Sequence, residues 1–161
     1  MDEFEILPAS GSDFHEINAL IEEHYAVPPV YFRPAFFSES SDVEQNERNI
    51  IFIAKDSCRI VGFITLHCDE SFIKTDNTAE FEIVIHPGYR KRGLGKNLLD
   101  RAIEYASNKT ILNQLVARIA ANNDASKRLC EKCGFQLSHK DPRGSLMILE
   151  ITHQSKVAQN D

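Results

Sequence analysis

The segment with the clearest chemical signature is a basic, glycine-containing stretch at residues 90–96. Gly93 and Gly95 carry no Cβ, so their backbone N–H groups can approach a ligand closely. An amphipathic helical pattern begins within this stretch, and the first N–H groups of a helix have no partners inside the helix. Together with the helix dipole and the cationic side chains, these N–H groups predict a binding site for a phosphate or pyrophosphate.

Two common phosphate-binding motifs do not fit this stretch. A P-loop would need glycine where the chain has Arg90, and Ser or Thr where it has Asn97. A dinucleotide-binding fingerprint would need a third glycine where the chain has Leu98. The pattern that does fit is R-x-x-G-x-G, placed between an expected strand at residues 80–85 and a helix.

Two carboxylates and a thiol are further candidates for chemistry. Glu80 and Glu82 alternate with apolar residues, so a regular strand would place both on one face, where their proximity raises one pKa. One of them is then a candidate general base; alternatively, both are solvated residues paired with lysines. Cys130 and Cys133 form C-x-x-C, which lacks a second pair for zinc and lies at a helix end, so both are interpreted as packing residues. The histidines show no metal-ligand spacing, and no metal site is expected.

Length and composition limit the class of protein. The 161 residues and 18.3 kDa suit one domain, and the net charge of −6 disfavours a nucleic-acid surface. No apolar run approaches the roughly 20 residues that span a bilayer. The acidic N-terminus lacks the positive region of a secretory signal, and four cysteines are too few for a disulfide scaffold. We therefore expect a cytoplasmic protein with reduced thiols that binds neither nucleic acid nor membrane.

The apolar patterns predict a single α/β domain over residues 1–151, built on a mixed sheet and followed by a polar tail at 152–161. Strands are expected at residues 4–7, 50–55, 59–67, 80–85, 115–120 and 145–151, and helices at 14–25, 94–106 and 124–132, with a further short helix at 42–49. Residues 25–40 are rich in aromatic side chains and form either a loop packed on the core or a wall of a small-molecule pocket.

The R-x-x-G-x-G pattern resembles the acetyl-CoA pyrophosphate loop of the GNAT superfamily of N-acetyltransferases. Residues 123–135 resemble that superfamily's N-x-x-[AS]-x-x-L-Y-E-K-x-G-F segment at nearly every position. Two motifs in the right order are far more specific than either alone, and the order of elements over residues 4–151 also agrees. The resemblance implies the GNAT fold, which is an α/β fold. Its central sheet of six or seven mostly antiparallel strands has splayed fourth and fifth strands and about four flanking helices.

The resemblance also implies acetyl-CoA as the acetyl donor, lying in the gap between the splayed strands. Backbone groups of Val84 and Ile85 would meet the pantetheine arm, and the loop amides would bind the pyrophosphate with Arg90 at its edge. Asn123 either contacts the cofactor or caps the following helix. The residues implied for cofactor binding are Val84, Ile85, Arg90, Lys91, Arg92, Gly93, Leu94, Gly95, Lys96 and Asn123.

The implied reaction is direct acetyl transfer to a primary amine, which needs a general base and a donor to the oxyanion. In relatives that resemble phosphinothricin acetyltransferases, a glutamate at the place of Glu80 is the base. Many relatives carry a tyrosine at the place of Cys130 that protonates the leaving thiolate. Here Cys130 is either that proton donor or an inert buried thiol, in which case water or Tyr89 serves. Relatives that acetylate ribosomal-protein N-termini have a glutamate where this chain has Arg118, so their catalytic pair is absent.

The expected function is acetyl transfer to the amine of a small molecule or amino-acid-like acceptor. One alternative is a protein or peptide N-acetyltransferase. Another is a non-catalytic acyl-CoA-binding regulatory module that retained the cofactor loop. Dimers are common in the superfamily, so the resemblance leaves a homodimer open.

Overall fold

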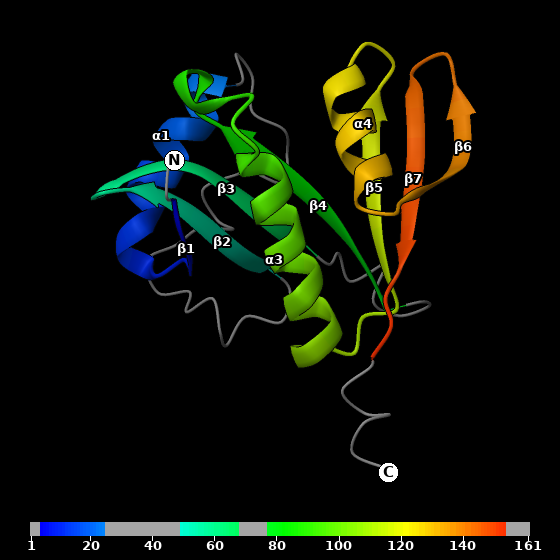
Figure 1. Ribbon diagram of the computed structural model, residues 1–161, viewed down its shortest axis with the longest axis horizontal. Coiled ribbons are helices and arrows are strands. Elements are labelled where there is room, and N and C mark those ends of the chain that lie inside the picture. Colours follow the sequence, from blue (N-terminus) through cyan, green and yellow to red (C-terminus); the bar gives the residue numbers. More distant parts are fainter. Residues whose placement is uncertain (1–3, 25–48, 68–76, 154–161) are drawn as a thin grey trace. The chain divides into compact units, whose positions relative to one another are not determined.

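The computed structural model describes residues 4–24, 49–67 and 77–153, apart from the side chain of residue 49 (Figure 1). The aromatic stretch at 25–40, nearly all of the expected helix at 42–49 and most of the polar tail lie outside these residues. None of the helices within the described residues is long and apolar enough to cross a membrane.

In the described part of the chain, seven strands form one mixed sheet in the order β1-β2-β3-β4-β5-β7-β6, which confirms the predicted α/β class. The strands are β1 (Glu5–Pro8), β2 (Asn49–Asp56), β3 (Arg59–His67), β4 (Thr78–Ile85), β5 (Gln114–Ala120), β6 (Gln136–Asp141) and β7 (Gly144–Glu150). The α-helices within the described residues are α1 (Phe14–His24), α3 (Leu94–Lys109) and α4 (Asp124–Lys132), and short 3-10 turns lie at Gly11–Asp13 and Pro87–Tyr89.

The chain divides into two compact units, residues 1–66 with 82–98 and residues 67–81 with 99–161. The division passes through β4 and through α3. Each unit is described separately below.

In the first unit, α1 packs its apolar stripe against the strands. Phe14, Ile17 and Ile21 follow the three- and four-residue spacing of a helix face, and all three are buried in a cluster with Ile53 and Phe63. The turn before α1 is closed by Asp13, whose carboxylate accepts a hydrogen bond from the Ser10 backbone N–H at 2.9 Å. The apolar periodicity thus fixes α1 on the strands of this unit.

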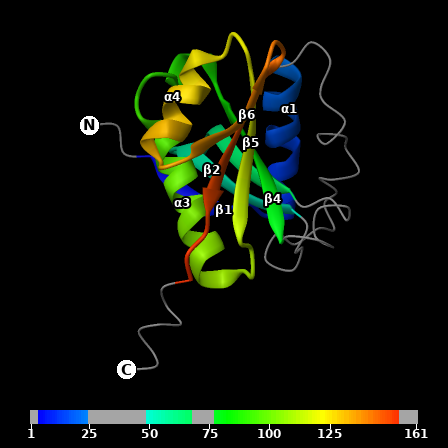
Figure 2. The same cartoon turned by 90° about the vertical axis from the view of Figure 1, so that its right-hand side faces the viewer.

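In the second unit, β5 pairs with β7 along its whole length and β7 pairs with β6, so the three strands lie side by side, as Figure 1 shows. In the turned view of Figure 2, the hairpin of β6 and β7 is seen in front of β5. The sequence pattern does not predict β6, because nearly all of its residues are exposed and carry no alternating apolar signal. Phe135, which follows α4, packs edge-on against Phe81 of β4 with ring centroids 5.5 Å apart. Gly134 has a φ of +93°, as expected for a glycine just past a helix end.

The parallel pairing of β4 with β5 is short. It joins Thr78, Ala79 and Glu80 to residues 114–116 of β5. Glu80 is therefore the last β4 residue in this ladder, and the side chain that the sequence suggests as a base lies at the point where the two strands stop pairing.

Candidate active site

The basic glycine loop connects β4 to α3 through the 3-10 turn at Pro87–Tyr89. Lys91 and Gly93 both adopt the left-handed backbone conformation, with φ of +63° and +80°. The first hydrogen bond that leads into α3 runs from the N–H of Asn97 to the carbonyl of Gly93 at 3.1 Å. The N–H groups of residues 94–96 therefore belong to the first turn, where a helix offers donors to an anion.

The backbone at Gly93 leaves room for a ligand. A Cβ built there would meet no heavy atom within 4 Å, so nothing in the described residues fills the space beside this glycine. Gly95 instead lies inside α3, where the backbone is helical. The two glycines thus have different roles. Position 93 favours glycine because its backbone has a positive φ, whereas glycine at position 95 leaves the first turn of α3 without a side chain there.

Arg90 anchors the loop. Its Nε donates to the carbonyl oxygen of Ile85 at 3.2 Å, and a terminal nitrogen lies 3.1 Å from Nδ1 of His24 at the end of α1. Partial burial, and secondarily the charge of Arg90, lower the pKa of His24 from its ordinary value. A neutral His24 can accept this hydrogen bond, so the guanidinium joins the loop both to β4 and to α1.

Tyr89 forms a second anchor. Its hydroxyl donates to Oδ2 of Asp56 at 2.7 Å, and the guanidinium of Arg92 lies 5.1 Å from its ring centroid. The hydrogen bond to Asp56 is the main reason that the pKa of Tyr89 is raised. No sequence pattern indicates this role of Asp56, because the pair joins the end of β2 to a loop far along the chain.

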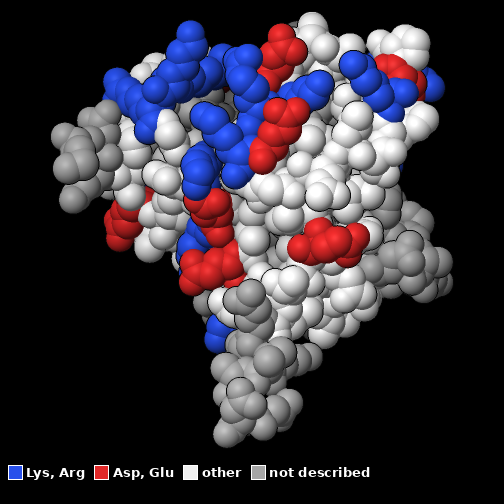
Figure 3. Space-filling view, turned by 45° about the vertical axis from the view of Figure 1, so that its right-hand side comes forward, with Lys and Arg blue, Asp and Glu red and all other residues white. Residues whose placement is uncertain are grey.

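His86 caps the turn that precedes the loop. Its Nδ1 accepts from the N–H of Gly88 at 3.1 Å, and its Nε2 lies 3.0 Å from a terminal nitrogen of Arg59. His86 therefore shapes the loop entrance through its hydrogen bond with the N–H of Gly88. In the view of Figure 3, Lys and Arg side chains gather at the level where α3 begins.

Glu80 forms an ion pair with Arg118 of β5. Nε of Arg118 lies 3.4 Å from Oε2 of Glu80, and the side chains are 61% and 12% exposed, respectively. Burial raises the pKa of Glu80 above its ordinary value, and the charge and hydrogen bond of Arg118 oppose that rise. The sequence anticipated a lysine as the alternative partner; the structure places an arginine there.

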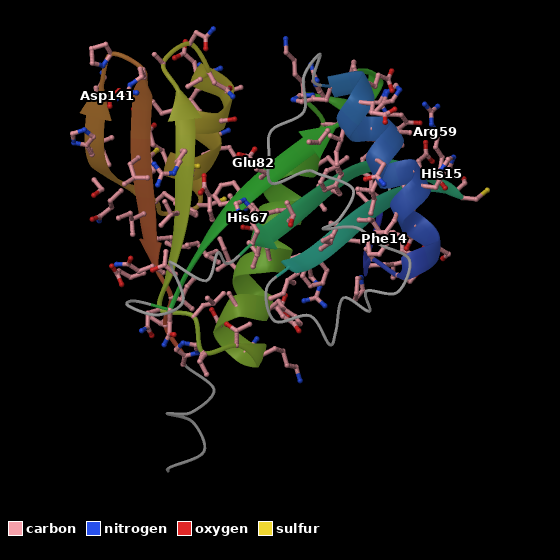
Figure 4. All side chains as sticks on the ribbon, turned by 180° about the vertical axis from the view of Figure 1, so that it is seen from behind. Phe14, His15, Arg59, His67, Glu82 and Asp141 are labelled. Carbon is pink, nitrogen blue, oxygen red and sulfur yellow. The ribbon has the colours of Figure 1, made fainter. Side chains whose placement is uncertain are left out.

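Glu82 is half-buried and lies on β4, where Figure 4 labels it. The buried positions Phe81 and Val84 are three residues apart, with Glu82 and Ile83 both half-buried between them. Because a regular strand alternates every two residues, β4 departs from the ideal pattern here. The departure begins after Glu82, because burial alternates regularly from Ala79 to Glu82. The shared face of Glu80 and Glu82 stays a prediction.

Cys130 lies in α4 and is 1% exposed. Burial, followed by the charges of Cys133 and Glu131, raises the pKa of the Cys130 thiol to about 12. The thiol therefore stays protonated at neutral pH and is a weak proton donor. Cys133 Sγ lies 3.8 Å from Oδ1 of Asp100. Within residues 4–24, 49–67 and 77–153, no three His, Cys, Asp or Glu side chains gather at a possible metal site.

Asn123 caps α4, as one of its two expected roles requires. Its Oδ1 accepts from the N–H of Ser126 at 3.2 Å. This side chain satisfies one of the donors that the first turn leaves open.

The comparison with protein families agrees with this loop and helix arrangement. A family model described as "Acetyltransferase (GNAT) family" matches residues 16–135. The chain belongs to this family. The GNAT match includes β4, the loop, α3, β5 and α4, and all of the expected site residues lie within it.

Curated relatives of this GNAT chain include enzymes with different acceptors. A spermidine N(1)-acetyltransferase of Vibrio cholerae is 28% identical over 52% of this chain and 47% of its own length. An L-methionine sulfoximine/L-methionine sulfone acetyltransferase of Salmonella typhimurium is 28% identical over 58% of this chain and 54% of its own length. The matched part thus spans about half the length of these relatives.

The fold is also that of solved GNAT proteins. A phosphinothricin acetyltransferase of Sinorhizobium meliloti, solved in complex with acetyl-CoA, has a TM-score of 0.74 at 20% identity, over 94% of this chain and 90% of that one. At this identity, the likeness supports the fold of the GNAT chain.

Proposed function

We propose that this GNAT chain is an acetyl-CoA-dependent N-acetyltransferase that acts on the primary amine of a small molecule or amino-acid-like acceptor. The observation that carries the proposal is the loop before α3, with its left-handed Gly93, the open space beside it and the first-turn N–H groups of the helix. This arrangement suits a pyrophosphate, and the family match supplies the cofactor class.

The residues present fit acetyl-CoA. The N–H groups of residues 91–96 would hold the pyrophosphate, with Arg92 and Lys96 adding charge. Arg90 instead acts through the loop, because its guanidinium already binds the Ile85 carbonyl and His24. When bound, acetyl-CoA supplies an activated acetyl thioester. Asn123 acts as the cap of α4, and a contact with the cofactor remains a prediction.

Glu80 is the proposed general base. Its carboxylate is mostly buried, and burial raises its pKa toward the range that favours proton uptake near neutral pH. An amine acceptor must lose its proton before it attacks, and Glu80 can receive that proton. Backbone N–H groups near Val84 and Ile85 remain candidates for the donor that stabilises the oxyanion, and Glu82 is retained as the alternative base.

Cys130 is proposed to be a packing residue. A buried thiol with a pKa of about 12 gives up its proton less readily than water-exposed acids, and the Tyr89 hydroxyl is held by Asp56. Water is therefore the proposed proton source for the departing thiolate. A homodimer and a cytoplasmic location also stay predictions.

The test is release of free thiol from acetyl-CoA over a panel of amines, amino acids and peptides. Turnover with small amines or amino acids supports the proposal. Turnover with peptides alone favours the protein N-acetyltransferase. Tight acetyl-CoA binding by calorimetry, with no turnover over the whole panel, favours the acyl-CoA-binding regulatory module.

A further inference from the structure

An open cleft lies in the second unit, beside β5 and the hairpin of β6 and β7. Its volume is about 450 Å³, which falls within the range of small-molecule sites. Three basic side chains line it: Arg118 of β5, His139 of β6 and Arg143 of the turn between β6 and β7. The acidic residue in its lining is Asp141, which Figure 4 labels at the end of β6.

The charge of Asp141 is already engaged by the hairpin. Its Oδ1 accepts from the N–H of Arg143 at 2.7 Å and from that of Gly144 at 3.2 Å, and its Oδ2 lies 3.9 Å from Nε2 of His139. The backbone donors compensate this carboxylate and shape the turn. The basic side chains therefore dominate the charge that the cleft presents to a ligand.

Arg118 connects the cleft to the proposed base. Its Nε faces Glu80, and its side chain is 61% exposed. Within the described residues, no other acidic side chain pairs with Arg118, and the guanidinium of Arg143 has no side-chain partner there. A guanidinium holds donors on two edges, so Arg118 can keep Glu80 on one edge and bind a second carboxylate on the other.

We propose that Arg118, assisted by Arg143 and His139, binds a carboxylate of the acceptor, so that the acceptor is an amine that also carries an acid group, as an amino acid does. This inference rests on the proposed function, which supplies the amine. One guanidinium then orients the acceptor and contacts the base that takes its proton. A polyamine is disfavoured, because its ammonium groups would face the basic side chains of the cleft without a free acidic partner.

A second consequence concerns Glu80. When the acceptor carboxylate is bound, the positive charge of Arg118 is shared between two carboxylates. It therefore stabilises the ionised form of Glu80 less than in the free protein. Binding of the acceptor acid thus makes Glu80 a better proton acceptor when the amine is in place. The relatives described above include both kinds of enzyme, a spermidine N(1)-acetyltransferase and an L-methionine sulfoximine/L-methionine sulfone acetyltransferase.

The experiment compares acceptors that are matched except for the acid. Acetyl transfer is measured for methionine and phenylalanine, for the α-amides of the same two amino acids, and for spermidine. We expect wild-type kcat/KM to be at least about tenfold higher for the acids than for the amides. In Arg118→Gln, the loss of the ion pair with Glu80 affects acids and amides alike, so the readout is the ratio of their kcat/KM values. We expect this ratio to fall about 10-fold or more, mostly through a rise in KM for the acids.

The controls separate binding from folding. Lys109→Gln removes a charge at the end of α3, outside the cleft, and leaves the preference for acids intact. Arg143→Gln is expected to weaken that preference partially, so it tests the cleft by a second variant that does not depend on the folding of Arg118→Gln. Circular dichroism checks that the Arg118 variant is folded. Equal rates for acids and amides in the wild type, or an equal loss for both in Arg118→Gln, overturn the inference while acetyl transfer stands.

A binding measurement keeps the two proposals distinct. The Nε–H signal of Arg118 is followed by NMR during titration with the same acids and amides. If no amine is acetylated, the proposed function fails. The titration then decides about Arg118 by itself: a shift with the acids alone supports the carboxylate site, and no shift with the acids overturns it.

Discussion

The hydroxyl of Tyr89 donates a 2.7 Å hydrogen bond to the carboxylate of Asp56, which joins the loop before α3 to the end of β2. The ring of the same tyrosine lies 5.1 Å below the guanidinium of Arg92. Arg92 belongs to the R-x-x-G-x-G motif, whereas Tyr89 and Asp56 lie outside it. This anchor positions the backbone N–H groups that the loop offers to a pyrophosphate.

Tyr89→Phe removes that anchor but leaves the ring. We expect the Kd for acetyl-CoA to rise roughly two- to tenfold, because one hydrogen bond is lost, while kcat stays close to that of the wild type. Calorimetry and thiol-release kinetics measure the two effects. Tyr105→Phe on α3 serves as the matched control. A fall in kcat of a hundredfold or more would instead make Tyr89 a proton donor.

Gly93→Ala and Gly95→Val separate backbone strain from close approach. A residue with a Cβ in the left-handed region costs about 1–2 kcal/mol, so Gly93→Ala should lower the free energy of unfolding and weaken acetyl-CoA binding. Gly95 is helical, so Gly95→Val should affect stability less and weaken cofactor binding through its side chain. Thermal unfolding and calorimetry measure both. Unchanged affinity in the two variants would remove the loop from the cofactor site.

Glu80→Gln tests the proposed base. Removing a general base is expected to lower kcat by about 10²- to 10⁴-fold while the affinity for acetyl-CoA stays the same. In the wild type, activity should fall as the pH drops through the raised pKa of Glu80, because protonation removes the base. That acid limb should be absent in Glu80→Gln. Glu82→Gln is the matched comparison, and wild-type rates for Glu80→Gln with a loss in Glu82→Gln would transfer the role to Glu82.

Cys130→Ala tests the packing role of the buried thiol. The substitution removes the sulfur from the interior, and we expect the free energy of unfolding to fall by about 1–2 kcal/mol. Turnover per folded molecule should stay within about twofold of the wild type, since a thiol with a pKa of about 12 is a poor acid. Urea unfolding and thiol-release kinetics provide the readouts. A large loss of kcat with normal stability would restore Cys130 as the proton donor.

The partial burial of His24, together with its contact with Arg90, predicts a pH dependence of stability. The pKa of His24 is lower in the folded protein than in the unfolded chain, so the unfolded chain binds the extra proton first as the pH falls. The stabilisation is complete above the ordinary pKa of histidine and is lost as the pH drops below it. Urea unfolding between pH 8 and pH 5 should show this slope. His24→Asn should flatten it, and an identical slope in that variant would contradict the assignment.

Much of the cofactor loop and of α4 was predictable from the sequence, because local rules apply there. The apolar spacing places α3 and α4, Asn123 caps α4, and Gly134 ends it with a positive φ. Gly93 was recognisable for the same reason, since a turn that needs left-handed backbone favours glycine. The left-handed conformation of Lys91 was not predictable in this way, because a lysine in the sequence does not indicate a positive φ.

By itself, the sequence determined the family, the class of cofactor and the elements that carry the loop, because these are encoded in contiguous residues and their periodicity. Only the tertiary structure decided which distant side chains meet: Tyr89 with Asp56, Arg90 with His24, and Arg118 with Glu80. Those pairs depend on strand register and on helix packing, which bring together residues that no local spacing relates. The same packing buries Glu80 and Cys130, and burial sets the direction in which their pKa values move.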